Sequence, residues 1–392
     1  MVRYPLSKTQ EVQEDYFGTV VKDPFRWLED DRSTETKEWV DEQNKVTQGF
    51  LAQIPFRKAI SQRLSKLMDY EKFSSPFKEG NYTYYYKNTG LQNQSVLYRQ
   101  KEGDEPEIFL DPNTFSKDGS TALAGISFSK DGSLVAYQTS KGGSDWTTAY
   151  VLDAENKHLI YEQIENVKFS DLAWQGNDGF YYSSYDKPNE GSQLSGKTEH
   201  HKLFYHTLGT AQTTDKLIFG GPELPRRYIS GSLTEDERFL VITAANSTSG
   251  NELYFQDLSV PDGKIQAIVE NFDKDHYIFY SEGERLYIYT NANAANGKVV
   301  IVNSKSPGME NWTDLIGETE NVLTPSTGGG KLFANYMKDA VSMVLQYNMM
   351  GELEHSVELP GPGTAIGFGS KSLEKKLYYT FSSYVYPATI FE

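Results

Sequence analysis

Residues 127–140 read SFSKDGSLVAYQTS, and this stretch decides the fold. An alternating segment leads into an Asp-Gly turn and a second apolar segment follows, which is the pattern of two antiparallel strands joined by a tight turn. Similar stretches begin at Ala173 (AWQGNDGFYYSSY), Ser232 (SLTEDERFLVITAA) and Gly367 (GFGSKSLEKKLYYTFS). The repetition of one hairpin along the chain predicts a repeat architecture built from β-structure.

The spacing of these hairpins predicts seven units. Weaker copies fit the remaining gaps at Tyr82–Asp111, Tyr277–Thr290 and Val322–Tyr336. Units of about 45 to 50 residues have the length of a four-stranded propeller blade. One small sheet cannot bury both of its faces, whereas sheets stacked radially cover one another. We therefore expect a mainly β fold, a seven-bladed β-propeller over residues 76–392, with its last blade incomplete where the sequence stops.

The first 75 residues have a different pattern, which is typical of helices. Apolar side chains recur at helical spacing over 33–51 and again over 55–68, where Pro55 suits the first turn of a helix. Each of these amphipathic helices needs a surface that covers its apolar face. We expect an N-terminal α-helical extension over residues 1–75, whose helices pack on each other or on the domain that follows.

Composition excludes several classes of function. The 392-residue chain has a net charge of −16, whereas binding to a phosphate backbone needs a basic surface. The chain has no Cys, which excludes disulfides, a thiolate nucleophile and Cys-based zinc sites. No apolar run approaches the roughly 20 residues that cross a membrane, and the N-terminus shows no secretory signal. We expect a cytoplasmic protein without nucleic-acid or membrane partners.

Motif searches weigh against catalysis by this chain. Residues 191–198 match the phosphate-binding P-loop pattern, but residues 202–208 alternate like a strand, whereas a P-loop opens a helix. His200, His201 and His206 have no carboxylate or Cys at metal-ligand spacing, which favours a structural role. No G-x-S-x-G run, the nucleophile elbow of α/β-hydrolases, occurs. The residues predict no cofactor, no metal site and no catalytic serine.

Several motifs occur in the order in which one peptidase family has them. Residues 23–30 read DPFRWLED and residues 110–113 read LDPN. The stretch 127–146 contains SKDG and GGSDW, and residues 167–170 read VKFS. Over essentially its whole length, the sequence resembles the prolyl oligopeptidase (prolyl endopeptidase) family of serine peptidases.

The resemblance implies both architecture and function. In that family a propeller covers an α/β-hydrolase domain, which carries the catalytic serine, histidine and acid and cleaves short peptides after proline. Those three positions follow the propeller and have no counterpart here, so the resemblance implies a non-catalytic, substrate-admitting portion that is inactive alone. The α/β-hydrolase domain, absent from this chain, and proline-containing oligopeptides would be its partners, with the N-terminal helices packed on that domain. A stand-alone propeller that binds peptides or proteins without enzymatic activity stays open as an alternative.

The resemblance also implies three substrate-binding residues. Asp145, in GGSDW, matches an aspartate that pairs with an arginine of the hydrolase domain near the substrate. Phe169, in VKFS, matches an aromatic residue of an apolar subsite. Tyr228 matches another subsite position, which a shift of one residue would assign to Ile229. The alternative for Phe169 and Tyr228 is ordinary blade core, and for Asp145 a turn residue bonded to its own backbone.

Overall fold

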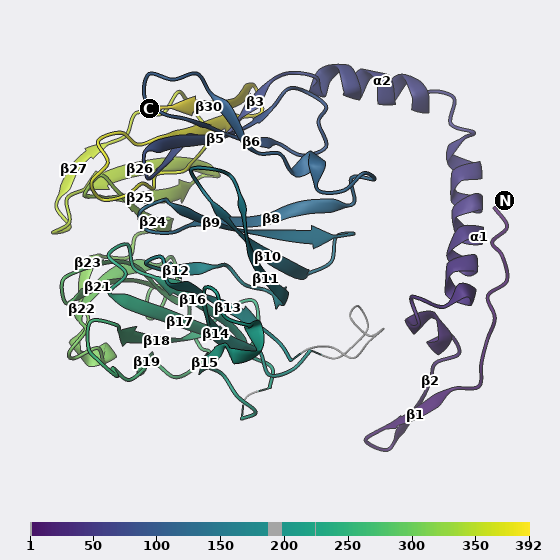
Figure 1. Cartoon of the computed structure of the whole chain (residues 1–392), viewed down its shortest axis with the longest axis horizontal. Coiled ribbons are helices and arrows are strands. Elements are labelled where there is room, and N and C mark those ends of the chain that lie inside the picture. Colours follow the sequence, from purple (N-terminus) through teal and green to yellow (C-terminus); the bar gives the residue numbers. More distant parts are fainter. Residues whose placement is uncertain (1, 187–197, 224) are drawn as a thin grey trace. The chain divides into compact units, whose positions relative to one another are not determined.

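The computed structural model describes residues 2–186, 198–223 and 225–392 (Figure 1). The chain divides into two compact units. The first holds the chain up to Glu71 together with Thr89–Gln92, and the second contains Lys72–Asn88 and most of the chain from Asn93 onward. No helix of the described residues is long and apolar enough to cross a membrane.

The first unit contains a β-hairpin and two α-helices, and both predicted helices are confirmed. Its elements are β1 (Gln13–Tyr16), β2 (Thr19–Lys22), the 3-10 helix η1 (Arg26–Glu29), α1 (Thr34–Leu51) and α2 (Arg57–Met68). α1 begins where the Ser33 side chain accepts a hydrogen bond from the backbone N–H of Thr36. In α2, the apolar side chains of Ile60, Leu64 and Leu67 are about half exposed. The apolar stripe of α2 is therefore not covered within its own unit.

The second unit consists of antiparallel strands grouped into sheets. The first sheet contains β3 (Lys72–Phe73), β4 (Phe77–Glu79), β5 (Tyr82–Asn88), β6 (Val96–Gln100) and β7 (Glu107–Leu110). The second contains β8 (Thr121–Phe128), β9 (Leu134–Lys141), β10 (Trp146–Asp153), β11 (Leu159–Lys168), β12 (Ala173–Gln175), β13 (Gly179–Ser184), β14 (Lys202–Thr207) and β15 (Lys216–Phe219).

Four further sheets follow along the chain. They contain β16 (Tyr228–Leu233), β17 (Phe239–Ala245), β18 (Asn251–Asp257) and β19 (Gln266–Val269); then β20 (His276–Glu282), β21 (Arg285–Thr290), β22 (Lys298–Asn303) and β23 (Thr313–Ile316); then β24 (Val322–Gly328), β25 (Lys331–Lys338), β26 (Val341–Tyr347) and β27 (Leu353–Ser356); and finally β28 (Thr364–Ile366), β29 (Tyr379–Ser383) and β30 (Tyr386–Phe391). Short 3-10 helices lie in three connections: η2 (Pro112–Thr114), η3 (Gln212–Thr214) and η4 (Met309–Asn311).

The fold is a mainly β propeller, but the expectation of seven blades is wrong. Among the described residues, the second unit has five sheets of four or more strands and one sheet of three, so the count of full sheets is five. The hairpins that begin at Ser127 and Ala173, which the repeat pattern assigns to separate blades, lie in a single eight-stranded sheet, because the end of β11 pairs with the end of β13 at Val167 and Ser184. Hairpin repeats are visible in the sequence, whereas pairing between hairpins depends on where each strand ends.

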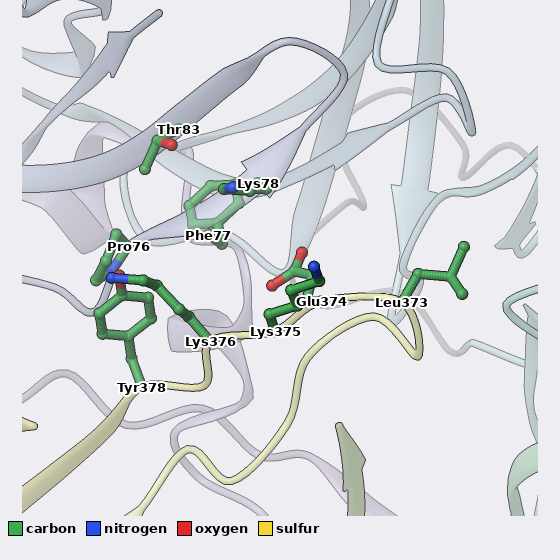
Figure 2. Close-up of a pocket in the computed structure, with 9 residues that line it drawn as sticks. All are labelled: Pro76, Phe77, Lys78, Thr83, Leu373, Glu374, Lys375, Lys376 and Tyr378. Carbon is green, nitrogen blue, oxygen red and sulfur yellow. The ribbon is translucent and has the colours of Figure 1, made fainter. Parts of the chain in front are cut away.

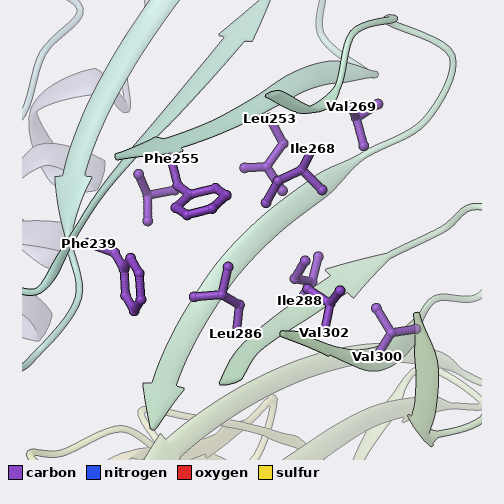
Figure 3. Close-up of a cluster of buried hydrophobic side chains, with 10 residues drawn as sticks. Phe239, Leu253, Phe255, Ile268, Val269, Leu286, Ile288, Val300 and Val302 are labelled. Carbon is purple, nitrogen blue, oxygen red and sulfur yellow. The ribbon is translucent and has the colours of Figure 1, made fainter. Parts of the chain in front are cut away.

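Apolar clusters join each sheet to the next along the chain. The largest lies between β16–β19 and β20–β23, where Phe239 and Phe255 pack with Leu286 and Ile288 (Figure 3). The phenylalanine rings meet edge to face, with centroids 5.8 Å apart. Because each strand alternates its side chains, β18 can present Phe255 to this cluster and Tyr254 to the cluster shared with the preceding sheet. Burial on both faces of a sheet explains why its strands are apolar at successive positions.

The first and last sheets meet through polar contacts instead. The Ser75 hydroxyl lies 3.3 Å from the Thr380 hydroxyl, and the Lys371 ammonium pairs with the Glu79 carboxylate. Among the described residues, no buried apolar cluster contains side chains from both sheets. This boundary between β3–β7 and β28–β30 is called the seam below.

A cavity of about 460 Å³ opens at the seam (Figure 2). Phe77, Lys78 and Thr83 line it from the first sheet, and residues 373–376 and Tyr378 line it from the loop before β29. It contains none of the three site residues predicted from the sequence. The cavity instead lies between the first sheet and the loop before β29.

A further contact connects sheets that are not neighbours along the chain. In the turn between β16 and β17, the Glu235 carboxylate accepts hydrogen bonds from the Ser372 backbone N–H at 2.9 Å and from the Ser372 hydroxyl at 2.8 Å. Ser372 lies between β28 and β29. The next residue, Asp236, accepts a 2.9 Å hydrogen bond at its carbonyl oxygen from Lys130, in the turn between β8 and β9. The turns between β8 and β9, between β16 and β17, and between β28 and β29 therefore meet at one end of the propeller.

Candidate functional site

Phe169 and Tyr228 meet at the opposite end of the strands. Phe169 follows β11 and Tyr228 begins β16, and their ring centroids are 5.7 Å apart at an interplanar angle of 66°. Phe169 is 46% exposed and Tyr228 is 49% exposed, whereas the next residue, Ile229, is 1% exposed. The two rings are thus accessible from solvent, and the side chain that a one-residue shift would select is buried.

Two more aromatic side chains extend this pair into an aromatic cluster, defined here as Trp146, Phe169, Tyr185 and Tyr228. The Tyr185 ring centroid lies 6.2 Å from that of Trp146 and 6.5 Å from that of Phe169, both in edge-to-face geometry. Tyr185 is only 7% exposed and forms the buried part of the cluster. The four residues meet because they lie at the same end of the strands. β10 and β16 begin there, and β11 and β13 end there.

The backbone around the cluster adopts an uncommon conformation. Phe169 has a φ of 51°, Asn166 of 55° and His200 of 64°. Non-glycine residues rarely adopt positive φ, and each such residue costs roughly 1–3 kcal/mol unless its surroundings hold it. The Ser184 hydroxyl supplies one such constraint by donating a hydrogen bond to the Asn166 carbonyl oxygen. The sharp turn after β11 directs the Phe169 ring away from the core.

His201 supplies a second constraint by bridging two strands. Its Nδ1 lies 2.9 Å from the backbone nitrogen of Ile229, and its Nε2 lies 2.9 Å from the carbonyl oxygen of Lys168. Because Nδ1 accepts from an N–H, the ring proton is on Nε2 and is donated to Lys168. The ring is 1% exposed and packs against Tyr185 with centroids 4.4 Å apart. His201 therefore holds the two residues that adjoin Phe169 and Tyr228.

Burial lowers the pKa of His201 from 6.5 to about 4. The unfolded chain therefore binds a proton at this residue at a higher pH than the folded chain does. We expect this residue alone to remove about 3 kcal/mol of stability as the pH falls from 6.5 to 4. Burial lowers the pKa of His276 to about 4 as well, so His276 adds a loss of the same sign.

A His201→Gln variant isolates the contribution of His201. Glutamine can accept from the Ile229 N–H and donate to the Lys168 carbonyl oxygen, but it does not titrate. Urea unfolding between pH 7 and pH 4 should show a shallower loss of stability for this variant than for the unmodified chain. An unchanged pH dependence would show that His201 does not stay neutral in the folded chain.

Asp145 lies beside the cluster and is exposed. It precedes Trp146, the first residue of β10. Its carboxylate has no hydrogen bond or ion pair with any residue that the structure describes, including its own turn. The structure thus places all three predicted residues at one end of the sheets, with direct ring contact between Phe169 and Tyr228.

Sequence reasoning did not select Trp146, Lys168, Tyr185 or His201 for this site. A usable signal existed, since Trp146 and Lys168 stand directly beside predicted residues in the GGSDW and VKFS motifs. The hydrogen bonds of His201 join distant segments and leave no trace in residue spacing. His206 similarly bonds Asp215 at 2.8 Å, a carboxylate partner that spacing did not reveal. Residues 191–197 of the P-loop match lie outside the described residues, and β14 supplies the strand expected after them.

Comparison with known proteins gives a consistent result. The family described as "Prolyl oligopeptidase, N-terminal beta-propeller domain" matches residues 4–392. The chain is 50% identical over 391 residues to the prolyl endopeptidase of Elizabethkingia miricola, covering 100% of this chain and 55% of that protein. It is 50% identical over 392 residues to that of Elizabethkingia meningoseptica, covering 100% and 56%. The chain spans about half the length of the curated relatives it matches.

Solved structures agree with these matches. Prolyl oligopeptidase B from Galerina marginata, bound to a 35mer hydrolysis and macrocyclization substrate, superposes with a TM-score of 0.87 at 25% identity, covering 99% of this chain and 58% of that one. A structure from an analysis of two prolyl endopeptidases gives a TM-score of 0.76 at 32% identity, covering 99% and 56%. This chain belongs to the prolyl oligopeptidase family and corresponds to the N-terminal β-propeller part of its members.

Proposed function

We propose that the chain admits and contacts substrate in a serine peptidase that hydrolyses short peptides after proline. The observation that carries this proposal is the half-exposed pair of Phe169 and Tyr228, held in place by the buried His201. Two rings set edge to face offer flat apolar surface at little cost in side-chain entropy, which suits a proline ring or a small apolar side chain. The names of the relatives support proline-containing peptides as the ligands.

The proposal includes an α/β-hydrolase domain as the partner that carries the catalytic residues. Two surfaces of the chain support it. The Asp145 carboxylate has no ionic partner among the described residues and would pair with an arginine of that domain. In the first unit, the half-exposed apolar side chains of α2 would be covered by it. A cytoplasmic location also belongs to the proposal, supported by the absence of Cys from the sequence.

Peptide binding by this chain tests the proposal. A neutral capped peptide such as acetyl-Gly-Pro-amide should bind and change the fluorescence of the chain, because Trp146 is in the aromatic cluster. Phe169→Ala should weaken binding at least about tenfold, the loss expected for removing an aromatic anchor. Tyr384→Ala is the matched control, since Tyr384 is fully exposed on a turn outside the cluster, and it should bind normally.

The same peptide with a fluorogenic leaving group should not be turned over by this chain. Turnover that a serine-directed phosphonate abolishes would contradict the non-catalytic role. Equal losses of binding in Phe169→Ala and Tyr384→Ala would contradict the assignment of the aromatic cluster as the peptide site.

A further inference from the structure

The ammonium group of Lys168 lies over two rings of the aromatic cluster. Its Nζ is 4.7 Å from the ring centroid of Trp146 and 5.1 Å from that of Phe169. Lys168 is the last residue of β11 and is the register partner of Trp146, the first residue of β10. Attraction between a cation and ring faces therefore keeps this ammonium group at the edge of the cluster, next to the exposed Phe169 ring.

Within the described part of the chain, no carboxylate pairs with this ammonium group. Lys168 Nζ makes no hydrogen bond or ion pair with any residue that the structure describes, and the neighbouring Asp145 carboxylate does not reach it. Lys101 provides the contrast, because its Nζ lies 4.8 Å from the Tyr82 ring centroid and also pairs with Glu155 at 2.9 Å. In a chain of net charge −16, Lys168 thus presents a positive charge on an aromatic surface without a carboxylate partner among the described residues.

The Phe169 ring has chemically different neighbours on its two sides, Tyr228 and Lys168. Towards Tyr228 the ring contributes to an apolar surface, and towards Lys168 it adjoins a positive charge. Ring faces stabilise the charge of an ammonium group but accept none of its three N–H donors in the way that an oxygen does. A carboxylate can accept them in short, charge-assisted hydrogen bonds. The site is therefore complementary to a ligand that joins a small apolar group to a carboxylate.

We propose that Lys168 is a specificity-determining residue that recognises a carboxylate of the bound peptide. The inference rests on the proposed function, because it assumes that the peptide packs on Phe169 and Tyr228. The preferred ligands are then peptides that carry an acidic group within about one residue of the side chain that packs on Phe169. Neutral peptides bind at the same rings without this additional contact.

Two peptides that differ in one functional group test the inference. Succinyl-Gly-Pro-amide carries a carboxylate in its cap, and succinamoyl-Gly-Pro-amide replaces that carboxylate with a neutral amide of the same shape. We expect the unmodified chain to bind the succinyl peptide about fivefold more tightly in low salt, as measured by isothermal titration calorimetry. The preference should shrink in 0.5 M NaCl, because salt screens a partly exposed ion pair.

Three variants assign the preference to Lys168. Lys168→Met should bind both peptides equally. Lys168→Arg should retain the preference, because arginine keeps both the charge and the affinity for ring faces. Lys101→Met is the matched control, since it removes a ring-bound lysine that already has a carboxylate partner, and it should keep the full preference.

The outcomes separate this inference from the function on which it rests. Equal binding of both peptides by the unmodified chain overturns the role of Lys168 and leaves the peptide site intact. A preference that persists in Lys168→Met shows that another group reads the carboxylate and also overturns the inference. Failure of the unmodified chain to bind either peptide overturns the inference together with the proposed function.

Discussion

Replacing Phe255 with alanine should lower the free energy of unfolding by about 3–5 kcal/mol, the loss typical of removing a buried aromatic side chain. Phe255 is 0% exposed and packs edge to face on Phe239 in the cluster that joins β16–β19 to β20–β23. The cavity left behind cannot close easily, because the hydrogen bonds of two sheets fix its walls.

Urea unfolding followed by circular dichroism measures this effect. Tyr384→Ala is the control, since it removes an aromatic side chain that is fully exposed and should change stability by no more than about 0.5 kcal/mol. If the two variants unfold at the same urea concentration, the cluster shown in Figure 3 does not hold the sheets together.

A disulfide across the seam should have an effect of similar size and opposite sign. Cysteines introduced at Ser75 and Thr380 replace hydroxyl groups whose oxygens are 3.3 Å apart. The chain has no Cys of its own, so only this pair can form. The bond would close a loop from residue 75 to residue 380, and we expect it to stabilise the chain by about 2–4 kcal/mol.

The physical reason is that the seam lacks an apolar cluster shared by its two sheets. Each of the other boundaries must be broken by separating buried side chains, whereas the seam can open by breaking polar contacts. Oxidised and reduced samples of the same double variant provide the comparison, with urea midpoints as the measurement. A disulfide that forms without raising the midpoint would show that unfolding begins elsewhere.

The sequence was most informative where a pattern is local. The helices predicted over 33–51 and 55–68 are present as Thr34–Leu51 and Arg57–Met68, because apolar spacing directly reflects helical geometry. The hairpin predicted over 127–140 is present as β8 and β9, with Asp131 and Gly132 in the turn. The number of full sheets could not be obtained in this way, because the Val167–Ser184 pairing depends on two strand ends that meet only after folding.

In the candidate site, too, the sequence indicated individual residues but not the contacts between distant segments. Resemblance selected Phe169 and Tyr228, but nothing in the 58 residues that separate them indicates that their rings touch. That contact depends on the positive φ at Phe169 and on the two hydrogen bonds of His201. Side chains of Ser, Thr, Asn and His that bind distant backbone have no periodic signature, so such bridges become visible only in three dimensions.

The bonds between Glu235 and Ser372 have a consequence for how one end of the propeller can open. They link turns of sheets that do not adjoin, at the end of the strands remote from the aromatic cluster. Separating these turns would require breaking both the Glu235–Ser372 bonds and the Lys130 contact beside them. The three turns at this end of the propeller are thus held against moving apart independently of one another.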